Sequence, residues 1–378
     1  MREAEVLIIG AGPAGSIAAI NLAPFRRVLM VERSATATPR IGESLLPAAR
    51  RLLSDMGLLE SFLAEPHEPW YGNRSVWGGT EPQEVDFLRD PDGHGWHLDR
   101  LRFEQWLQVA AQKRGAELWQ SAVVEKLERE GDRWRATVKA PDGPLTISAN
   151  LIIDAGGRAA QISRKLGARS KTKDKLVCAW EYGCDQQNSG RGLTYVEAVK
   201  DGWWYTAPIP GGRRVLAFHT DADLLRVSQR ETKKGTLLER TRSVKELSGL
   251  LSTVGFVADD RPGFAIAHSA MLSPCAGEGW LAVGDAAISF DPLSSQGLLN
   301  ALFTGLAAAE ATESYLKGDS SSLDEYSQII RGIGDSYQTH LAFHYAAETR
   351  WPRAPFWQRR QPGIDSATLP SHASDDSH

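Results

Sequence analysis

The sequence predicts an α/β fold: a parallel sheet flanked by helices, joined to an antiparallel β lobe and followed by a C-terminal helical segment. Three observations predict it. A glycine-rich turn joins a buried strand to a helix near the N-terminus, strand-like segments run from Leu176 to about Thr220, and helical periodicity extends from Leu298 to about Glu348. At 378 residues the chain is long enough for two packed lobes, or for one domain with a large insertion.

Composition excludes several classes of protein. Apolar residues make up 42% and charged residues 24% of the chain, and a net charge of −4 gives no electrostatic reason to expect a nucleic-acid partner. The three cysteines are too scattered for a disulfide framework or a zinc site, and we expect no metal. No stretch approaches the roughly eighteen apolar residues that a membrane span needs, so we expect a cytoplasmic protein.

The first forty residues have the order strand, turn, helix, strand. Glu5–Ile9 is short and nearly all apolar, as in a strand buried on both faces of a parallel sheet. Ala14–Ala23 follows as a helix, and Val28–Val31 as the next buried strand. This order predicts a βαβ unit that binds a nucleotide.

The turn of this unit has the spacing G-x-G-x-x-G. Gly10 permits the tight turn, Gly12 lets the backbone approach a pyrophosphate, and Gly15 allows close packing of helix on strand. The helix that opens at Pro13 and Ala14 would stabilise the negative charge of that pyrophosphate.

The second strand ends at an acidic residue. Glu32 follows Gly12 by about twenty residues, a spacing at which its carboxylate can accept hydrogen bonds from ribose hydroxyls, and we assign the adjacent Arg33 to the same site. Such a site suits an unphosphorylated ribose. The turn alone therefore admits either FAD or NAD.

The remaining elements follow along the chain. Helices are predicted over Ala48–Phe62 and Arg102–Arg114, a hairpin over Trp134–Ser148, and a buried strand at Leu151–Asp154. Further strands are predicted at Tyr195–Val199, Trp203–Thr206, Val215–His219 and Gly279–Val283.

Segments far from the turn decide between FAD and NAD. A buried strand ends at Asp154, and the small residues that follow, including Gly156, allow a close backbone approach to a diphosphate. After the strand Gly279–Val283 come Gly284 and Asp285, whose carboxylate could accept hydrogen bonds from a ribityl chain. The stretch from Pro292 to Gly297 then opens a helix whose N-terminus could stabilise a reduced flavin.

Together with Gly42–Pro47 and Gly95–Phe103, these segments resemble the glutathione-reductase-type FAD family. Within it they are similar to the branch of flavin hydroxylases, geranylgeranyl reductases and flavin-dependent halogenases. The resemblance covers most of the chain and implies a Rossmann-type, hydroxylase-like FAD-binding lobe with an antiparallel β substrate lobe and a C-terminal helical segment. It also implies that the flavin lies beside Gly42, Glu43, Ser44 and Arg100.

The resemblance also suggests how the chain is divided. We assign residues 1–70, 95–170 and 275–315 to the FAD-binding lobe, 71–94 and 171–274 to the substrate-binding β lobe, and 316–360 to the C-terminal helical segment. The tail 361–378, rich in Ser, Asp, His and Pro, is expected to be disordered.

Halogenation becomes a minority interpretation on three grounds. Halogenases direct hypohalous acid with an essential lysine some thirty residues after the Gly-Glu-Ser loop, and Glu68–Trp77 contains none. Their Trp-x-Trp-x-Ile-Pro pattern survives only at Trp203 and Pro208. Ser294 stands where tryptophan halogenases carry a glutamate.

The chain resembles most the flavoproteins that mature tryptophylquinone-containing amine and amino-acid oxidases by hydroxylating a tryptophan of a partner protein. We therefore expect an FAD monooxygenase acting on an aromatic ring, either a small molecule or a protein-bound tryptophan. No catalytic side chain is identified. Candidates for the wall of the substrate pocket are Trp77, Trp203, Trp204, Tyr205 and Pro208.

Several alternatives stay open. The chain could be a halogenase-like or geranylgeranyl-reductase-like oxidoreductase, or a non-enzymatic FAD-binding assembly factor for a partner oxidase. The electron source is also open, because no second G-x-G-x-x-G motif is present. Either NAD(P)H binds transiently or a separate flavin reductase supplies the electrons.

Overall fold

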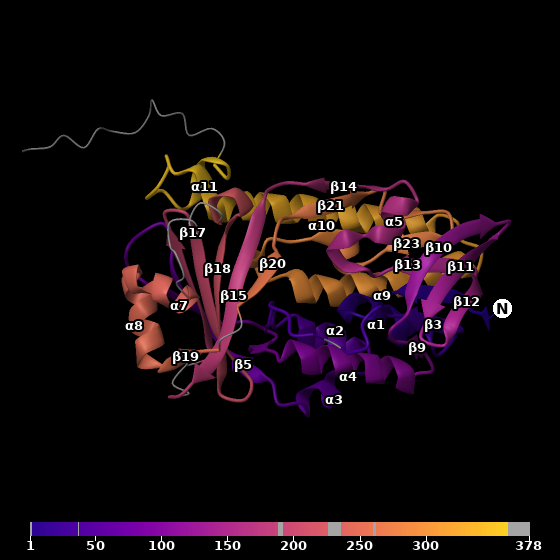
Figure 1. Ribbon diagram of the computed structural model, residues 1–378, viewed down its shortest axis with the longest axis horizontal. Coiled ribbons are helices and arrows are strands. Elements are labelled where there is room, and N and C mark those ends of the chain that lie inside the picture. Colours follow the sequence, from indigo (N-terminus) through magenta and orange to yellow (C-terminus); the bar gives the residue numbers. More distant parts are fainter. Residues whose placement is uncertain (1, 37, 188–191, 226–235, 260–261, 362–378) are drawn as a thin grey trace, which may run out of the picture.

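The computed structural model describes residues 2–36, 38–187, 192–225, 236–259 and 262–361. Two large sheets dominate it, one at each end of the molecule (Figure 1). The predicted tail lies outside the described residues except for Gln361. No helix of the described part is long and apolar enough to cross a bilayer.

The first sheet is the expected parallel one. Its order is β22-β23-β13-β2-β3-β9, and all neighbours are parallel except β22 and β23. The predicted strands Val28–Val31 and Leu151–Asp154 are confirmed residue for residue. The strands are β22 (Ala276–Gly277), β23 (Trp280–Ala282), β13 (Leu151–Asp154), β2 (Val6–Ile9), β3 (Val28–Val31) and β9 (Glu117–Trp119).

Helices pack on this parallel sheet. The apolar run at Val6–Ile9 is buried because α1 and the other helices cover the sheet, as expected for a strand without alternating polar residues. Gly305 allows α9 to approach α1 closely, since a Cβ there would lie 2.5 Å from the Ala14 carbonyl oxygen. The helices are α1 (Pro13–Leu22), α4 (Arg100–Lys113), α5 (Gln161–Lys165), α9 (Gly297–Leu316) and α10 (Ser322–Ala346).

One predicted helix is wrong in extent. The stretch Ala48–Phe62 forms two helices, α2 (Ala49–Asp55) and α3 (Leu59–Leu63). Gly57 lies between them with φ of +64°, a left-handed conformation that ends a helix. The apolar periodicity continues across the break because both helices pack on the same core.

Smaller sheets complete this half of the molecule. The predicted hairpin is confirmed as β11 and β12, within a four-stranded sheet of order β1-β12-β11-β10. These strands are β1 (Arg2–Glu3), β10 (Val123–Glu130), β11 (Arg133–Ala140) and β12 (Gly143–Ala149). One three-stranded sheet has the order β4 (Ser44–Leu45), β8 (Gly95–His97) and β5 (Glu68–Trp70). A second has the order β14 (Arg169–Thr172), β21 (Ala270–Ser273) and β24 (Ile288–Ser289).

The second large sheet has eight strands, and its main path is β19-β15-β18-β17-β16-β6-β7. It is antiparallel as predicted except where β6 pairs in parallel with β16. Strand β20 pairs separately with β15. The strands are β19 (Phe256–Ala258), β15 (Leu176–Asp185), β18 (Arg213–Asp221), β17 (Gly202–Ile209), β16 (Leu193–Val199), β6 (Gly72–Val76), β7 (Gln83–Asp86) and β20 (Gly263–Ile266).

Both faces of this second sheet are covered. Helices α7 (Leu237–Arg240) and α8 (Lys245–Thr253) pack on its outer face, whereas α10 and α11 (Pro355–Gln358) reach its other side (Figure 1). Nearly every residue of β17 and β18 is therefore buried, on both faces. The lobe boundaries that we drew from the sequence stay a prediction.

Candidate active site

Two adjoining cavities occupy the space between the two large sheets. Cavity 1, of about 510 Å³, extends from the carboxyl ends of β2, β3 and β13 to the eight-stranded sheet. Cavity 2, of about 330 Å³, lies between β6, β16 and β17 and the helix α10. Tyr205, Pro292 and Ser295 line both cavities, so the two share a wall.

Cavity 1 gathers residues that the sequence assigned to one site. All of the candidate cofactor residues line it except Gly15. They come from separate segments: Gly10, Gly12, Pro13, Ala14, Glu32, Arg33, Gly42, Glu43, Ser44, Arg100, Asp154, Gly156, Gly284, Asp285, Pro292 and Gly297. Ligands of open parallel sheets bind at the carboxyl ends of the strands, which is where this cavity begins.

The three glycines of the turn differ in what surrounds them. Gly10 has φ of +109°, and a Cβ there would lie 2.3 Å from the Ala155 carbonyl oxygen. A Cβ on Gly15 would lie 2.2 Å from the Gly10 carbonyl oxygen, so this glycine serves packing behind the cavity. A Cβ on Gly12 would have no neighbour within 4 Å. Gly12 thus presents bare backbone to cavity 1.

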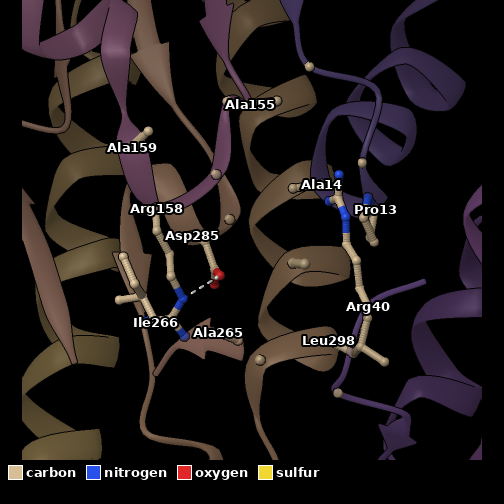
Figure 2. Close-up of a pocket in the computed structure, with 18 of the residues that line it drawn as sticks. Pro13, Ala14, Arg40, Ala155, Arg158, Ala159, Ala265, Ile266, Asp285 and Leu298 are labelled. Atoms are coloured by element: carbon tan, nitrogen blue, oxygen red, sulfur yellow. Dashed lines mark ion pairs between the residues drawn. The ribbon is translucent and has the colours of Figure 1, made fainter. Parts of the chain in front are cut away.

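The start of α1 faces cavity 1 as an anion site. The first N–H groups of a helix lack partners within it and carry a partial positive charge. Figure 2 shows Arg40 pointing toward Pro13 and Ala14 at this helix start. No motif pointed to Arg40, a lone arginine in an irregular segment.

Glu32 shapes the turn as well as the cavity. Its Oε2 accepts a hydrogen bond from the Ala11 N–H at 2.9 Å, and its Oε1 accepts one from the Ser34 N–H at 3.0 Å. Each carboxylate oxygen has a second lone pair, which leaves capacity for ribose hydroxyls. Arg33 beside it is exposed at the edge of cavity 1.

The two aspartates predicted near the middle of the cofactor have different surroundings. Asp154 is buried, and its Oδ2 accepts hydrogen bonds from the backbone and the hydroxyl of Ser163, both at 2.8 Å. Its Oδ1 accepts from the Gly156 N–H at 3.0 Å, so Asp154 mainly fixes the turn. Asp285 forms an ion pair with Arg158 at 3.2 Å inside cavity 1 (Figure 2).

Glu43 is a buried carboxyl without an ion-pair partner among the described side chains. Arg100 lies nearby but donates to the Gly42 carbonyl at 2.8 Å and to Glu104 at 2.7 Å. Burial raises the pKa of Glu43, against the opposing effect of the Tyr182 and Gly42 hydrogen bonds.

The hydrogen bonds of Tyr182 agree with a protonated Glu43. The Tyr182 hydroxyl lies 2.7 Å from Glu43 Oε1 and 2.8 Å from the Arg40 carbonyl oxygen. A phenol has one proton and a carbonyl oxygen only accepts. Both contacts are full hydrogen bonds when Tyr182 donates to Arg40 and a neutral Glu43 donates to Tyr182.

Only two of the five predicted substrate-pocket residues line cavity 2. Trp203 and Tyr205 do so, because residues two apart on a strand face the same side. Trp204 is a correction: it points to the other face and packs with Phe218. Pro208, four residues after Trp204 on the same strand, faces the same side as Trp204 and lines neither cavity.

Trp77 is a correction as well. It lines neither cavity and instead anchors the end of β6, since its indole N–H donates to the His344 carbonyl at 2.8 Å. Its ring packs on Trp357 with 5.4 Å between centroids. The sequence could not separate a wall tryptophan from one that fixes a strand end.

Trp203 is held rigidly between the two cavities. Its ring stacks on His219, which lines cavity 1, with 3.7 Å between centroids and 6° between planes. Its indole N–H donates to the Tyr345 hydroxyl at 3.2 Å, and Tyr345 donates to Asp291 Oδ2 at 2.7 Å. Burial lowers the pKa of His219 to about 3, which keeps this ring neutral.

Cavity 2 is aromatic and uncharged. No Lys, Arg, Asp or Glu is found among the described residues that line it. Its polar side chains come from Asn73, Thr194, Ser294, Ser295 and Gln296, from the hydroxyl groups of Tyr205 and Tyr337, and from two histidines on α10. In the part of the chain that the structure describes, no three metal-ligating side chains come together.

The residues of cavity 1 fit FAD. Gly12 offers an open backbone and α1 a helix start for the pyrophosphate, and Glu32 lies where the adenosine ribose would be. The cavity continues past Asp285 to the Gly42–Ser44 loop and the start of α9. Asp285 would hold the ribityl chain, and the Gly42–Ser44 loop and the start of α9 would hold the flavin ring.

Comparisons with known proteins agree with this fit. The family described as FAD binding domain matches residues 3–336. A protein of Marinomonas mediterranea named as a FAD-dependent oxidoreductase, LodB, is 28% identical over 95% of this chain and 97% of its own length. Sulochrin halogenase gedL of Aspergillus terreus is 29% identical over 90% of this chain and 68% of its own.

Two solved structures share the fold. That of CmlS, a flavin-dependent halogenase, superposes with a TM-score of 0.85 at 26% identity, covering 97% of this chain and 69% of that one. That of the peptidyl tryptophan dihydroxylase QhpG, described as essential for tryptophylquinone cofactor biogenesis, superposes with a TM-score of 0.74. Its identity is 22%, over 97% of this chain and 81% of that one, which is a likeness of fold.

Two glycine variants should separate folding from cofactor binding. Gly12→Ala adds a methyl group into open space, so we expect a normal unfolding free energy but FAD affinity lowered by at least about tenfold. Gly10→Ala forces a methyl group onto the Ala155 carbonyl, so the unfolding free energy of the FAD-free protein should fall by about 2–4 kcal/mol. Urea unfolding and FAD titration measure both. Equal loss of stability in the two variants would contradict this account.

Arg40→Gln should weaken FAD binding by about tenfold, because it removes a positive charge directed at the start of α1. Raising the salt concentration should weaken FAD binding by the wild type more than by the variant. Titration of the FAD-free protein with FAD measures both effects. Arg27→Gln, at an exposed arginine outside cavity 1, is the control and should bind as the wild type does.

Asp291 should make stability depend on pH. Burial raises its pKa from 3.8 to about 6, so its contribution is present below pH 4 and is lost as the pH rises through 6. Asp291→Asn removes this titration. Between pH 4 and 7 the wild type should lose about 3 kcal/mol more unfolding free energy than the variant. Parallel pH curves of the two proteins, measured by urea unfolding, would show that Asp291 is ionised throughout.

Proposed function

Because this chain belongs to the FAD binding domain family and is an FAD-dependent oxidoreductase of the monooxygenase type, we propose that it hydroxylates an aromatic ring, the indole of a tryptophan in a partner protein. The observation that carries the proposal is cavity 2: an uncharged aromatic slot that shares a wall with the FAD cavity. Such a hydroxylation would be a step in the maturation of a quinone cofactor within that partner protein.

The size of cavity 2 favours one aromatic side chain. Ligand pockets usually measure about 300–1,000 Å³, and 330 Å³ lies at the lower end of that range. Trp70, Phe87, Trp203 and Tyr205 supply aromatic walls against which a planar ring can pack.

The absence of charge in cavity 2 favours a tryptophan side chain within a polypeptide over free tryptophan as the substrate. Free tryptophan carries an ammonium and a carboxylate group, and burying either without a partner is costly. No carboxylate, lysine or arginine is found among the described lining residues to pair with either group. Within a peptide these two charges do not exist, and the indole alone would enter.

Cavity composition also favours oxygen insertion over halide transfer. The lysine that a halogenase needs is absent from the described residues that line either cavity. Ser294, where tryptophan halogenases carry a glutamate, lines cavity 2. The relatives named as halogenases thus share the fold with this chain, whereas their halogenating lysine has no counterpart in the two cavities.

In the proposed hydroxylation, residues of this chain would hold the cofactor, orient the ring in a water-free site and hold a proton. The residues of cavity 1 would hold FAD, which in its reduced form would supply the activation of molecular oxygen toward an electron-rich ring such as indole. The wall residues Trp203 and Tyr205 would orient the ring and keep water out of the shared boundary. Glu43, in the loop beside which the flavin ring would lie, would hold a proton at Oε1, hydrogen-bonded to the Tyr182 hydroxyl.

The source of electrons stays a prediction: NAD(P)H binding transiently, or a separate flavin reductase. The decisive experiment avoids this question by reducing the FAD-loaded protein chemically in the absence of oxygen. Oxygen-18 gas is then admitted with acetyl-Lys-Val-Trp-Val-Lys-amide, with N-acetyltryptophanamide or with free tryptophan, in the presence of bromide.

We expect the peptide to gain the mass of one labelled oxygen, N-acetyltryptophanamide to react more slowly, and free tryptophan least. Val196→Trp fills cavity 2 and should abolish the product while leaving FAD content unchanged. Transfer of bromine would establish a halogenase instead. No oxygenated product from any of the three compounds would refute the proposal.

A further inference from the structure

Strand β7 forms one edge of the eight-stranded sheet. It pairs with β6 on one side, and on its other side no strand of the described residues pairs with it. Its four residues, Gln83–Asp86, are all exposed. An edge strand of this kind offers unpaired N–H and C=O groups to which another extended segment can add.

The direction of the backbone groups on β7 follows from one hydrogen bond. The Phe87 N–H donates to the Tyr71 carbonyl, on the side of β6. Backbone groups alternate along a strand, so the N–H groups of residues 83 and 85 also face β6. Those of Glu84 and Asp86 therefore point outward, away from the sheet.

The free edge is continuous with the wall of cavity 2. Asn73 on β6 lines the cavity, and its cross-strand partner is Val85, which therefore faces the same side. Phe87, two residues further, also lines the cavity and packs on Trp70 with 5.0 Å between centroids. Val85 is 63% exposed, so the apolar wall runs out to the edge.

The opposite wall of cavity 2 is open to solvent. His340 and His344 line the cavity from α10, and both are exposed. Between them in sequence Phe343 is 72% exposed. The lining of cavity 2 thus reaches the surface at the two histidines of α10 on one side and beside the exposed Val85 of β7 on the other.

The hairpin is acidic. Glu81, Glu84 and Asp86 are all exposed, and Arg89 is the one cationic side chain from residue 81 to residue 89. On the partner strand β6, Arg74 lies 3.8 Å from Glu84, so carboxylates still outnumber cations on this hairpin. Carboxylates on an edge strand discourage pairing with acidic or neutral chains and attract basic ones.

We propose that β7 is a docking edge: an extended, basic segment of the substrate protein adds to β7 as a further strand and directs its aromatic residue into cavity 2. This inference rests on the proposed function, because it takes the occupant of cavity 2 to be a side chain of a polypeptide. The added strand would lie about 4.8 Å from β7, with alternate side chains facing the same side as Val85 and Phe87.

The test uses the FAD-loaded protein and acetyl-Lys-Val-Trp-Val-Lys-amide, with affinity measured by calorimetry. Two further peptides carry N-methyl groups on alternate sets of backbone amides. Strand addition uses only one set, so methylation of that set should weaken binding about tenfold or more, and methylation of the other set should have little effect. Equal affinities of the two methylated peptides would overturn the proposal.

Variants of Glu84 test the same edge from the protein side. Glu84→Pro removes an outward N–H, which an edge strand tolerates, whereas Glu84→Gln keeps that N–H. Both variants remove the Glu84 charge and its 3.8 Å ion pair with Arg74 of β6. Glu84→Pro should bind the peptide about tenfold more weakly than Glu84→Gln, with FAD content and melting temperature as controls of folding. If Glu84→Pro misfolds, the two N-methylated peptides and hydrogen exchange in the wild type still test whether the peptide adds to β7. Peptide should slow exchange at the amides of Glu84 and Asp86, and unchanged exchange there would overturn the proposal.

Failure of this inference is distinguishable from failure of the proposed function. If N-acetyltryptophanamide and the peptide are oxygenated equally and Glu84→Pro has no effect, the docking edge is refuted while the hydroxylase stands. If the peptide protects the Glu84 and Asp86 amides but no product forms, the docking edge stands and the hydroxylase is refuted.

Discussion

The close approach of two backbone turns is the constraint on which the site depends. Gly10 and Ala155 end neighbouring strands, β2 and β13, and a side chain on Gly10 would meet the Ala155 carbonyl at 2.3 Å. Gly15 lets α1 pack against the same turn. Because these contacts bring the helix start, the Glu32 carboxylate and the Asp154 turn to one place, cavity 1 can hold a dinucleotide at the carboxyl ends of the strands.

The proposed reaction would also require a rigid boundary between the two cavities. Strand β17 supplies it, since Trp203 and Tyr205 face the cavities while Trp204 faces the outer core. Trp203 is fixed by the His219 stack and by the hydrogen bonds through Tyr345 to Asp291. Cavity 1 and cavity 2 are thereby connected through packed and hydrogen-bonded groups.

Sequence patterns predicted the parts of the fold that short-range geometry dictates. The glycine turn and its flanking strands could be assigned because their spacing alone implies a shape, whereas Gly42–Ser44 and Arg100 were assigned from the resemblance to known flavoproteins. The aromatic wall could not, because a tryptophan that lines a pocket and one that fills a core have the same sequence signature, as Trp203 and Trp204 show. Arg40 and the absence of charge in cavity 2 emerge only when distant segments meet in space.

The central claim is that an aromatic ring in cavity 2 faces the flavin ring across the wall formed by Tyr205, Pro292 and Ser295. A crystal structure of the FAD-loaded protein with bound acetyl-Lys-Val-Trp-Val-Lys-amide tests it most directly. The account predicts the indole in cavity 2 and the flavin ring at the Gly42–Ser44 end of cavity 1. An indole bound outside cavity 2, or a flavin ring directed away from Tyr205, would contradict it.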